Sequence, residues 1–106
     1  MNLKQVNDYS YTALIFACDK KLEKVALKML EFGAEACNLN HVSNAGFRAL
    51  IISCGLKLTN IALKILNFSP EECNLHQKYN NNNSLSIAKE NNLLPVCLKI
   101  LNHIKK

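Results

Sequence analysis

The sequence of 106 residues contains three copies of one helical pattern, and this repetition constrains the fold more than any other feature. Leu50 stands 36 residues after Leu14, and Leu85 stands 35 residues after Leu50. A repeat of this length predicts supersecondary units that stack on one another, because one unit alone cannot bury its apolar faces. The register also holds for the segments VALKML, IALKIL and VCLKIL, which begin at Val25, Ile61 and Val96.

The second segment of each copy is amphipathic. In the first copy its apolar residues recur at i, i+3, i+4 and i+7, the spacing of one face of an α-helix. Leu27, Leu63 and Leu98 widen the apolar stripe, which predicts a helix held between neighbouring copies and buried on two sides. The stripe of the first copy comprises Leu22, Val25, Ala26, Met29 and Leu30.

Capping residues indicate where these helices begin and end. Thr12 and Asn83 are good N-caps at aligned positions, whereas Arg48 at the same place in the middle copy is a poor one. Pro95 stands in the first turn of the last helix, where its missing N–H costs little. Gly33 is expected to end the second helix of the first copy as a C′ residue. Each copy is therefore predicted to be a pair of short helices.

The composition is that of a folded chain, with 49% hydrophobic and 20% charged residues, and the length allows a single domain. The opening segment MNLKQVNDYS lacks the apolar region of a secretion signal, and no apolar run approaches the roughly 18 residues that span a bilayer. A cytoplasmic location without a membrane partner is expected. The five cysteines are an odd number, and together with that location this predicts reduced thiols instead of a disulfide framework.

The segments TALIFAC and LEKVALKMLEFGA, with RAL at Arg48 and the glycine of NAGF at Gly46, resemble the ankyrin repeat. The resemblance extends from about Tyr9 to Asn102 and departs from the family pattern at Ala13 and Ile15, where proline and histidine are usual. It implies an all-α solenoid of about three helix-turn-helix repeats within a single domain over residues 1–106. The repeats would span approximately 9–43, 44–78 and 79–106.

The resemblance implies a non-catalytic protein–protein interaction module, an adapter or inhibitor scaffold whose connections and first helices grip a protein partner. The sequence, which is rich in asparagine and lysine, is similar to short ankyrin-repeat proteins of large DNA viruses of amoebae. This similarity implies a host factor as partner. Carried over by position, the partner-binding candidates are Asn40, His41, Ser43, Asn44, Arg48, His76, Gln77, Tyr79, Asn80, Asp19 and Lys20.

Each candidate has a plain structural alternative. Asparagines in connections satisfy backbone groups in turns, and Asn38 and Asn74 recur at equivalent positions, which favours a scaffold role for both. His41, Gln77 and Tyr79 differ between copies, and variation on a repeated scaffold is typical of specificity. Either a contact or a solvated bystander fits each of these three.

Two short Cys-His spacings raise the question of a metal site. Four ligands on one zinc ion must each approach within about 2.3 Å, but equivalent positions of stacked helices lie about 8 to 10 Å apart. The same spacing disfavours a disulfide between Cys18 and Cys54. We therefore expect structural cysteines, no metal and no cofactor. The residues concerned are Cys37 with His41 and Cys73 with His76.

Other classes of function remain as alternatives. No paired-carboxylate, phosphate-loop or nucleophile motif is present, which disfavours an enzyme. The net charge of +5 would suit a nucleic-acid-binding repeat protein with a steep salt dependence, but the lysines are dispersed and lack interleaved aromatics. A self-assembling structural protein, or a homodimer through the C-terminal helix, follows if the apolar stripe there is exposed. That stripe comprises Val96, Leu98, Ile100, Leu101 and Ile104.

Overall fold

The computed structural model describes residues 5–8, 11–39, 41–43, 48–68 and 83–104. Regular secondary structure within these ranges is entirely α-helical, which confirms the all-α prediction. The helices form three consecutive pairs: α1 (Ala13–Asp19) with α2 (Glu23–Leu30), α3 (Ala49–Gly55) with α4 (Thr59–Ile65), and α6 (Ser84–Glu90) with α7 (Leu94–Ile104).

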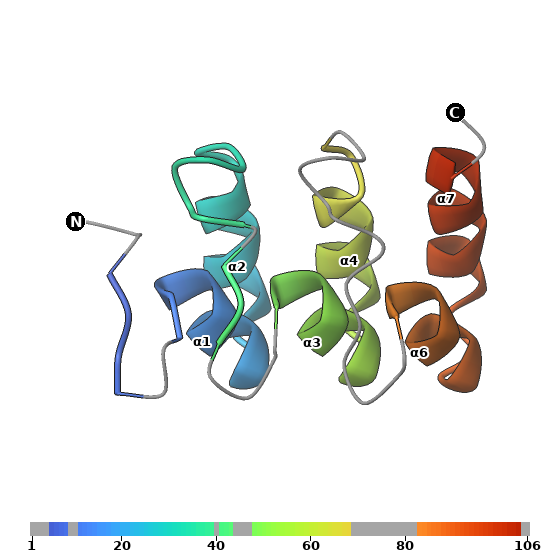
Figure 1. The fold of residues 1–106 in the computed structure, drawn as a ribbon, viewed down its shortest axis with the longest axis horizontal. Coiled ribbons are helices and arrows are strands. Elements are labelled where there is room, and N and C mark those ends of the chain that lie inside the picture. The colour runs from blue at the N-terminus through green and yellow to red at the C-terminus, as the bar shows by residue number, and fades with distance from the viewer. Residues whose placement is uncertain (1–4, 9–10, 40, 44–47, 69–82, 105–106) are drawn as a thin grey trace.

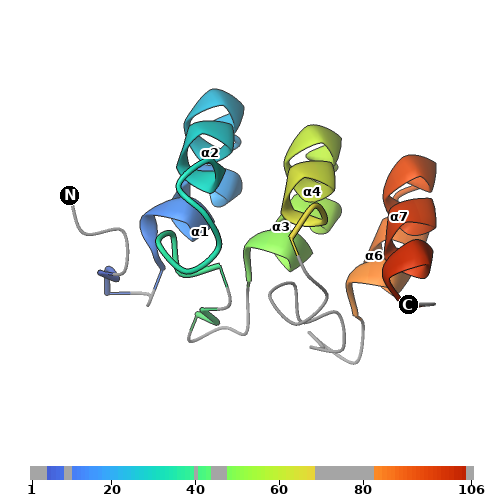
Figure 2. The same ribbon diagram turned by 90° about the horizontal axis from the view of Figure 1, so that it is seen from above.

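The three pairs stand side by side in two layers (Figure 1). One layer consists of α1, α3 and α6, with α3 packed against both of its neighbours, and the other consists of α2, α4 and α7 in the same order. Figure 2 shows the two layers from above, with the members of each pair lying against each other. The main contacts run within a pair or between adjacent pairs, so only the middle pair has a neighbour on both sides.

The predicted N-caps are confirmed at the first and third pairs. The Thr12 side-chain oxygen accepts a hydrogen bond from the Ile15 N–H at 3.2 Å. Asn83 forms a capping box with Ser86, because its Oδ1 accepts from the Ser86 N–H at 2.9 Å and its own N–H donates to Ser86 Oγ at 3.0 Å. Arg48 precedes α3 without a capping bond from its side chain, as expected for that residue type.

The turn inside each pair is the same Schellman motif, and it makes the three pairs structurally equivalent. Lys21, Lys57 and Asn92 occupy the left-handed region at φ 59°, 61° and 59°. The following residue donates its N–H back to the first helix, from Leu22 to the Ala17 carbonyl at 2.8 Å and likewise in the other pairs. The equivalent bonds join Leu58 to Ser53 at 2.8 Å and Leu93 to Ala88 at 3.0 Å.

Gly33 has the positive φ expected of a helix-ending glycine, at 100°, but it lies one residue later than predicted. The C-cap of α2 is Glu31, so Phe32 is C′ and Gly33 is C″. Tighter bonds extend the last turn, because the Phe32 N–H donates to the Met29 carbonyl and the Gly33 N–H donates to the Leu30 carbonyl, both at 3.1 Å.

Burial of the second-layer helices on two sides is observed in the middle pair, where Ile61 on one side and Leu66 on the other are both fully buried. The same prediction is wrong for α2. Ala26 and Leu30 are buried there, but Leu22 and Val25 each remain 45% exposed. The amphipathic pattern is the same in both helices, and the difference is that α4 has α2 and α7 as neighbours whereas α2 has α4 alone in its layer.

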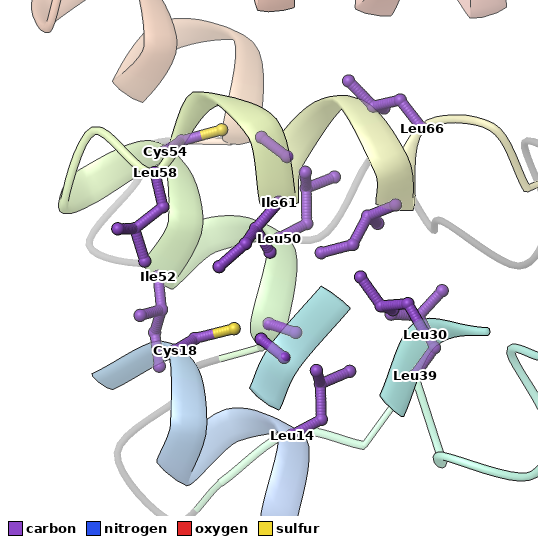
Figure 3. Packing of buried hydrophobic residues seen from close by; sticks show 14 of the residues in the cluster. Leu14, Cys18, Leu30, Leu39, Leu50, Ile52, Cys54, Leu58, Ile61 and Leu66 are labelled. Atoms are coloured by element: carbon purple, nitrogen blue, oxygen red, sulfur yellow. The ribbon is translucent and has the colours of Figure 1, made fainter. Parts of the chain in front are cut away.

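The core runs along the boundary between the two layers. Leu50 of α3 and Ile61 of α4 lie close together in its centre (Figure 3). The connection after α2 is anchored to this core, because Ala34, Cys37 and Leu39 are all buried. No helix in the described ranges is long and apolar enough to cross a membrane.

Candidate binding surfaces

Asp19 is the last residue of α1 and Lys20 is its C-cap, and both are exposed, as contact with a partner would require. The Lys20 Nζ lies 5.8 Å from the centroid of the Phe16 ring, a cation–π contact that covers part of the ring. The positions equivalent to Asp19 and Lys20 are Gly55 and Leu56 in the second pair and Glu90 and Asn91 in the third. We refer to these six residues as the tip positions.

The candidates in the first connection divide by burial. His41 is half-buried, so part of the residue is accessible. Ser43 is 5% exposed and Arg48 is 2% exposed, so neither presents its side chain to a partner in this arrangement. The remaining candidates lie outside the described residues; they are Asn40, Asn44, His76, Gln77, Tyr79 and Asn80.

The burial of Arg48 corrects its assignment as a contact residue and has a simple cause. Arg48 stands at the N-cap position of α3, and the equivalent Thr12 before α1 is 0% exposed. This position is therefore buried in the first two pairs, whereas Asn83 at the same place in the third pair is half-buried. Arg48 was a contact candidate because its position was carried over from the ankyrin resemblance, and its alignment with Thr12 was the signal that could have placed it inside.

Asn38 has a scaffold role. It adopts the left-handed conformation at φ 54°, which asparagine tolerates better than most residues. Its N–H donates to the Glu35 carbonyl at 3.1 Å, and its carbonyl accepts from the His41 N–H at 3.0 Å. Asn38 therefore shapes the connection that carries His41, as the structural alternative predicted. Asn74 lies outside the described residues.

The cysteines of the described ranges are buried free thiols. Burial raises the pKa of Cys18 to about 11 and that of Cys54 to about 12. Burial also raises the pKa of Cys37, whose Sγ lies 3.8 Å from the Ala34 carbonyl oxygen. A thiol held neutral in this way is a poor metal ligand and a poor nucleophile.

The described ranges hold no group of three or more metal-ligating side chains. Two members of the Cys-His set considered from the sequence, Cys73 and His76, lie outside these ranges.

Two apolar surfaces lie at the ends of the stack, and only the one on α7 was anticipated. At the α2 end, Leu22 and Val25 are each 45% exposed and Phe32 is 66% exposed. At the α7 end, Leu98 is 56% exposed and Leu101 is 37% exposed. A hollow of about 490 Å³ occupies that end, lined by Lys89, Asn92, Leu94, Cys97, Leu98 and Leu101.

The surface at the α2 end was missed because its residues belong to the stripe predicted to be buried. The position of α2 at one end of the repeat was the signal that could have revealed it.

Comparisons with protein-family models, with curated proteins and with solved structures found no match to this chain.

Proposed function

We propose that the chain is an ankyrin-type repeat protein and a non-catalytic module that binds a protein partner as an adapter or inhibitor scaffold. The support from the fold is the equivalence of its three pairs, each closed by the same left-handed turn and stacked in two layers. Stacked pairs of this kind present the same positions at regular intervals, which suits recognition of an extended surface on another protein.

The observation that carries the proposal is the contrast between buried and accessible positions of the repeat. Ala17, Ser53 and Ala88 occupy one equivalent position, and all three are small and buried. The tip positions that follow them are exposed or half-buried, and their residues vary between the pairs: the first position recurs as acidic only in Asp19 and Glu90, and the second is basic, apolar or amide. A constant scaffold with varied accessible side chains is the arrangement expected of a surface that selects a partner.

The partner surface that follows from this contrast includes Asp19 and Lys20 at the tip of the first pair and His41 in the connection. Ser43 and Arg48 are excluded from it, because they are buried. Opposite charges at neighbouring tip positions favour a partner of mixed charge. A nucleic acid would instead require a continuous basic surface.

A pull-down from nuclease-treated eukaryotic lysate tests this proposal. The immobilised chain is compared with the variant Asp19→Ala/Lys20→Ala/His41→Ala. A matched control, Glu23→Ala/Lys24→Ala/Asn60→Ala, alters exposed residues of α2 and α4 and preserves the net charge in the same way. Both variants are first shown to be folded by circular dichroism.

Retention of a protein by the wild type and the control, but not by the tip variant, is the expected result. Equal retention by all three would contradict the assignment of this surface. A second outcome would replace the function itself: nucleic acid bound in an untreated lysate, with affinity that falls steeply with salt and is lost when Lys20, Lys21, Lys24 and Lys28 are changed together.

A further inference from the structure

Each second-layer helix has two apolar sides, and the two outer pairs reveal which neighbour each side faces. The leading side is defined in α2 by Leu22, Val25, Met29 and Phe32 and by their equivalents in the other pairs. Val25 is 45% exposed, whereas its equivalents Ile61 and Val96 are both 0% exposed. The leading side is therefore the side covered by the preceding pair.

The trailing side shows the opposite gradient. It is defined in α7 by Leu98 and Leu101 and by their equivalents in the other pairs. Leu101 is 37% exposed, whereas its equivalents Leu30 and Leu66 are 2% and 0% exposed. The trailing side is therefore the side covered by the following pair, and the stack ends with one leading side and one trailing side uncovered.

Polar contacts at the junction between α4 and α7 follow the same order. Lys99 donates from Nζ to the Asn67 Oδ1, and the His103 Nε2 lies against the Leu66 carbonyl oxygen. Both Lys99 and His103 belong to α7 of the third pair. Their partners, Asn67 and Leu66, lie at the end of α4 in the second pair. At this junction the following pair thus contributes a lysine, Lys99, and the preceding pair contributes an asparagine, Asn67.

The same donor and acceptor are repeated at the two open ends. Lys28 is equivalent to Lys99, and its side chain is 76% exposed. Asn102 is equivalent to Asn67 and is also exposed. The uncovered sides therefore match each other in both apolar and polar residue types, as the two halves of an internal junction do.

We infer that a second copy of this chain stacks head to tail on the first, with the leading side of its α2 on the trailing side of α7. The occupant is identified by continuity with the internal junction between α4 and α7, because the new contact brings together the equivalent apolar positions and the equivalent lysine and asparagine. The hollow of about 490 Å³ at the α7 end receives the side chains of Leu22 and Val25 of the second copy. Lys28 of that copy reaches Asn102 of the first.

This contact is heterologous, because different surfaces of the two copies meet. Each added copy leaves one leading side and one trailing side uncovered, so the assembly grows as an open series instead of closing as a symmetric dimer. Lysines stand near both ends, with Lys24 on α2 and Lys89 lining the hollow. Salt screens their repulsion and therefore strengthens the association, which is the opposite of its effect on nucleic-acid binding.

Analytical ultracentrifugation of two end variants tests the inference. Val25→Glu places a charge on the leading side and Leu98→Glu places one on the trailing side; both positions are already exposed in the single chain, so folding is preserved. Asn60→Glu, on an exposed position of α4, is the control for the added charge. Circular dichroism verifies that all variants are folded.

The wild type and the control are expected to form a series of oligomers that grows with concentration, while each end variant alone stays monomeric. An equimolar mixture of the two end variants should give a dimer and nothing larger, because one intact leading side and one intact trailing side remain available. A wild type that stays monomeric up to about 1 mM, where contacts of about −4 kcal/mol are detected, overturns the inference. A dimer that Leu98→Glu abolishes and Val25→Glu preserves overturns it too, in favour of symmetric pairing through α7.

Discussion

The side chain of Asn91 crosses from the third pair to the second and donates from Nδ2 to the carbonyl oxygen of Cys54 at 2.8 Å. Asn91 is the C-cap of α6, and Cys54 lies in the last turn of α3. The bond joins the two first-layer helices at the point where both end. The equivalent residues of the other pairs are Lys20 and Leu56, so this contact belongs to one junction of the stack.

Replacing Asn91 with alanine is expected to lower the free energy of unfolding by about 1 kcal/mol, the usual net contribution of one hydrogen bond. The Cys54 carbonyl also accepts from the Lys57 N–H at 3.4 Å, so it is not left unpaired, and the loss stays modest. Urea denaturation measures the change. Glu90→Ala alters the neighbouring exposed residue and should change the stability little; equal effects of the two substitutions would contradict a role for the bond.

The two N-caps should contribute unequally. Thr12→Ala removes one capping bond and is expected to cost about 1 kcal/mol, whereas Asn83→Ala breaks a capping box and should cost more, up to about 2 kcal/mol. Thr12→Ser and Asn83→Asp retain the capping oxygen and are the matched controls. Chemical denaturation of the four variants tests the order, and a larger loss at Thr12 would refute it.

The left-handed turn residues allow a pair of substitutions with opposite signs. Lys57 adopts φ 61°, a left-handed conformation that is sterically unfavourable for a non-glycine residue. Asparagine adopts this conformation with a smaller steric penalty than lysine. Lys57→Asn should therefore raise the free energy of unfolding by about 0.5 to 1 kcal/mol. Asn92→Lys, at φ 59° in the third pair, should lower it by a similar amount. Thermal unfolding of both variants measures the two shifts, which must differ in sign.

The buried thiols make the stability depend on pH in the alkaline range. Burial raises the pKa of Cys18 to about 11 and that of Cys54 to about 12, above the ordinary value of 9.0. Their contribution is fully present below pH 9. Above pH 9 the unfolded chain loses thiol protons that the folded chain retains, so stability falls as the pH rises toward 11 or 12, by at most about 1.4 kcal/mol per pH unit for each thiol.

Urea denaturation between pH 7 and 10 tests this dependence by comparing wild type with Cys54→Ala. The variant is less stable at pH 7 because a buried group is removed, but its stability should decline less steeply above pH 9. The two proteins differ only at residue 54, so the difference between the two slopes isolates the thiol. Parallel slopes would contradict the role of Cys54.

The repeat register was sufficient to predict the paired helices and most of their ends. Val25, Ile61 and Val96 do occupy equivalent places in α2, α4 and α7, and Thr12 and Asn83 do cap the helices that follow them. These features were predictable because caps and helical periodicity depend on residues a few positions apart. The recurrence of asparagine at Asn38 and Asn74 also favours a scaffold role, which agrees with the left-handed conformation of Asn38.

The extent of burial could not be predicted in the same way, because it depends on neighbours that the local pattern does not specify. Val25 and Ile61 have the same place in the repeat and the same apolar character, yet one is 45% exposed and the other 0%. Arg48 shows the converse error, since its position in the ankyrin resemblance suggested a contact residue, whereas its side chain is enclosed by the stack. The remaining connection candidates stay predictions, because they lie outside the described residues.

The order of contacts along the stack also determines how the chain comes apart. The main contacts of α2 and α7 reach no further than the middle pair, whereas α3 and α4 are held from both sides. Opening of an outer pair therefore breaks one junction, and opening of the middle pair breaks two. Backbone amides of α3 and α4 should exchange with solvent deuterium last, as the outer pairs fray and re-form around them.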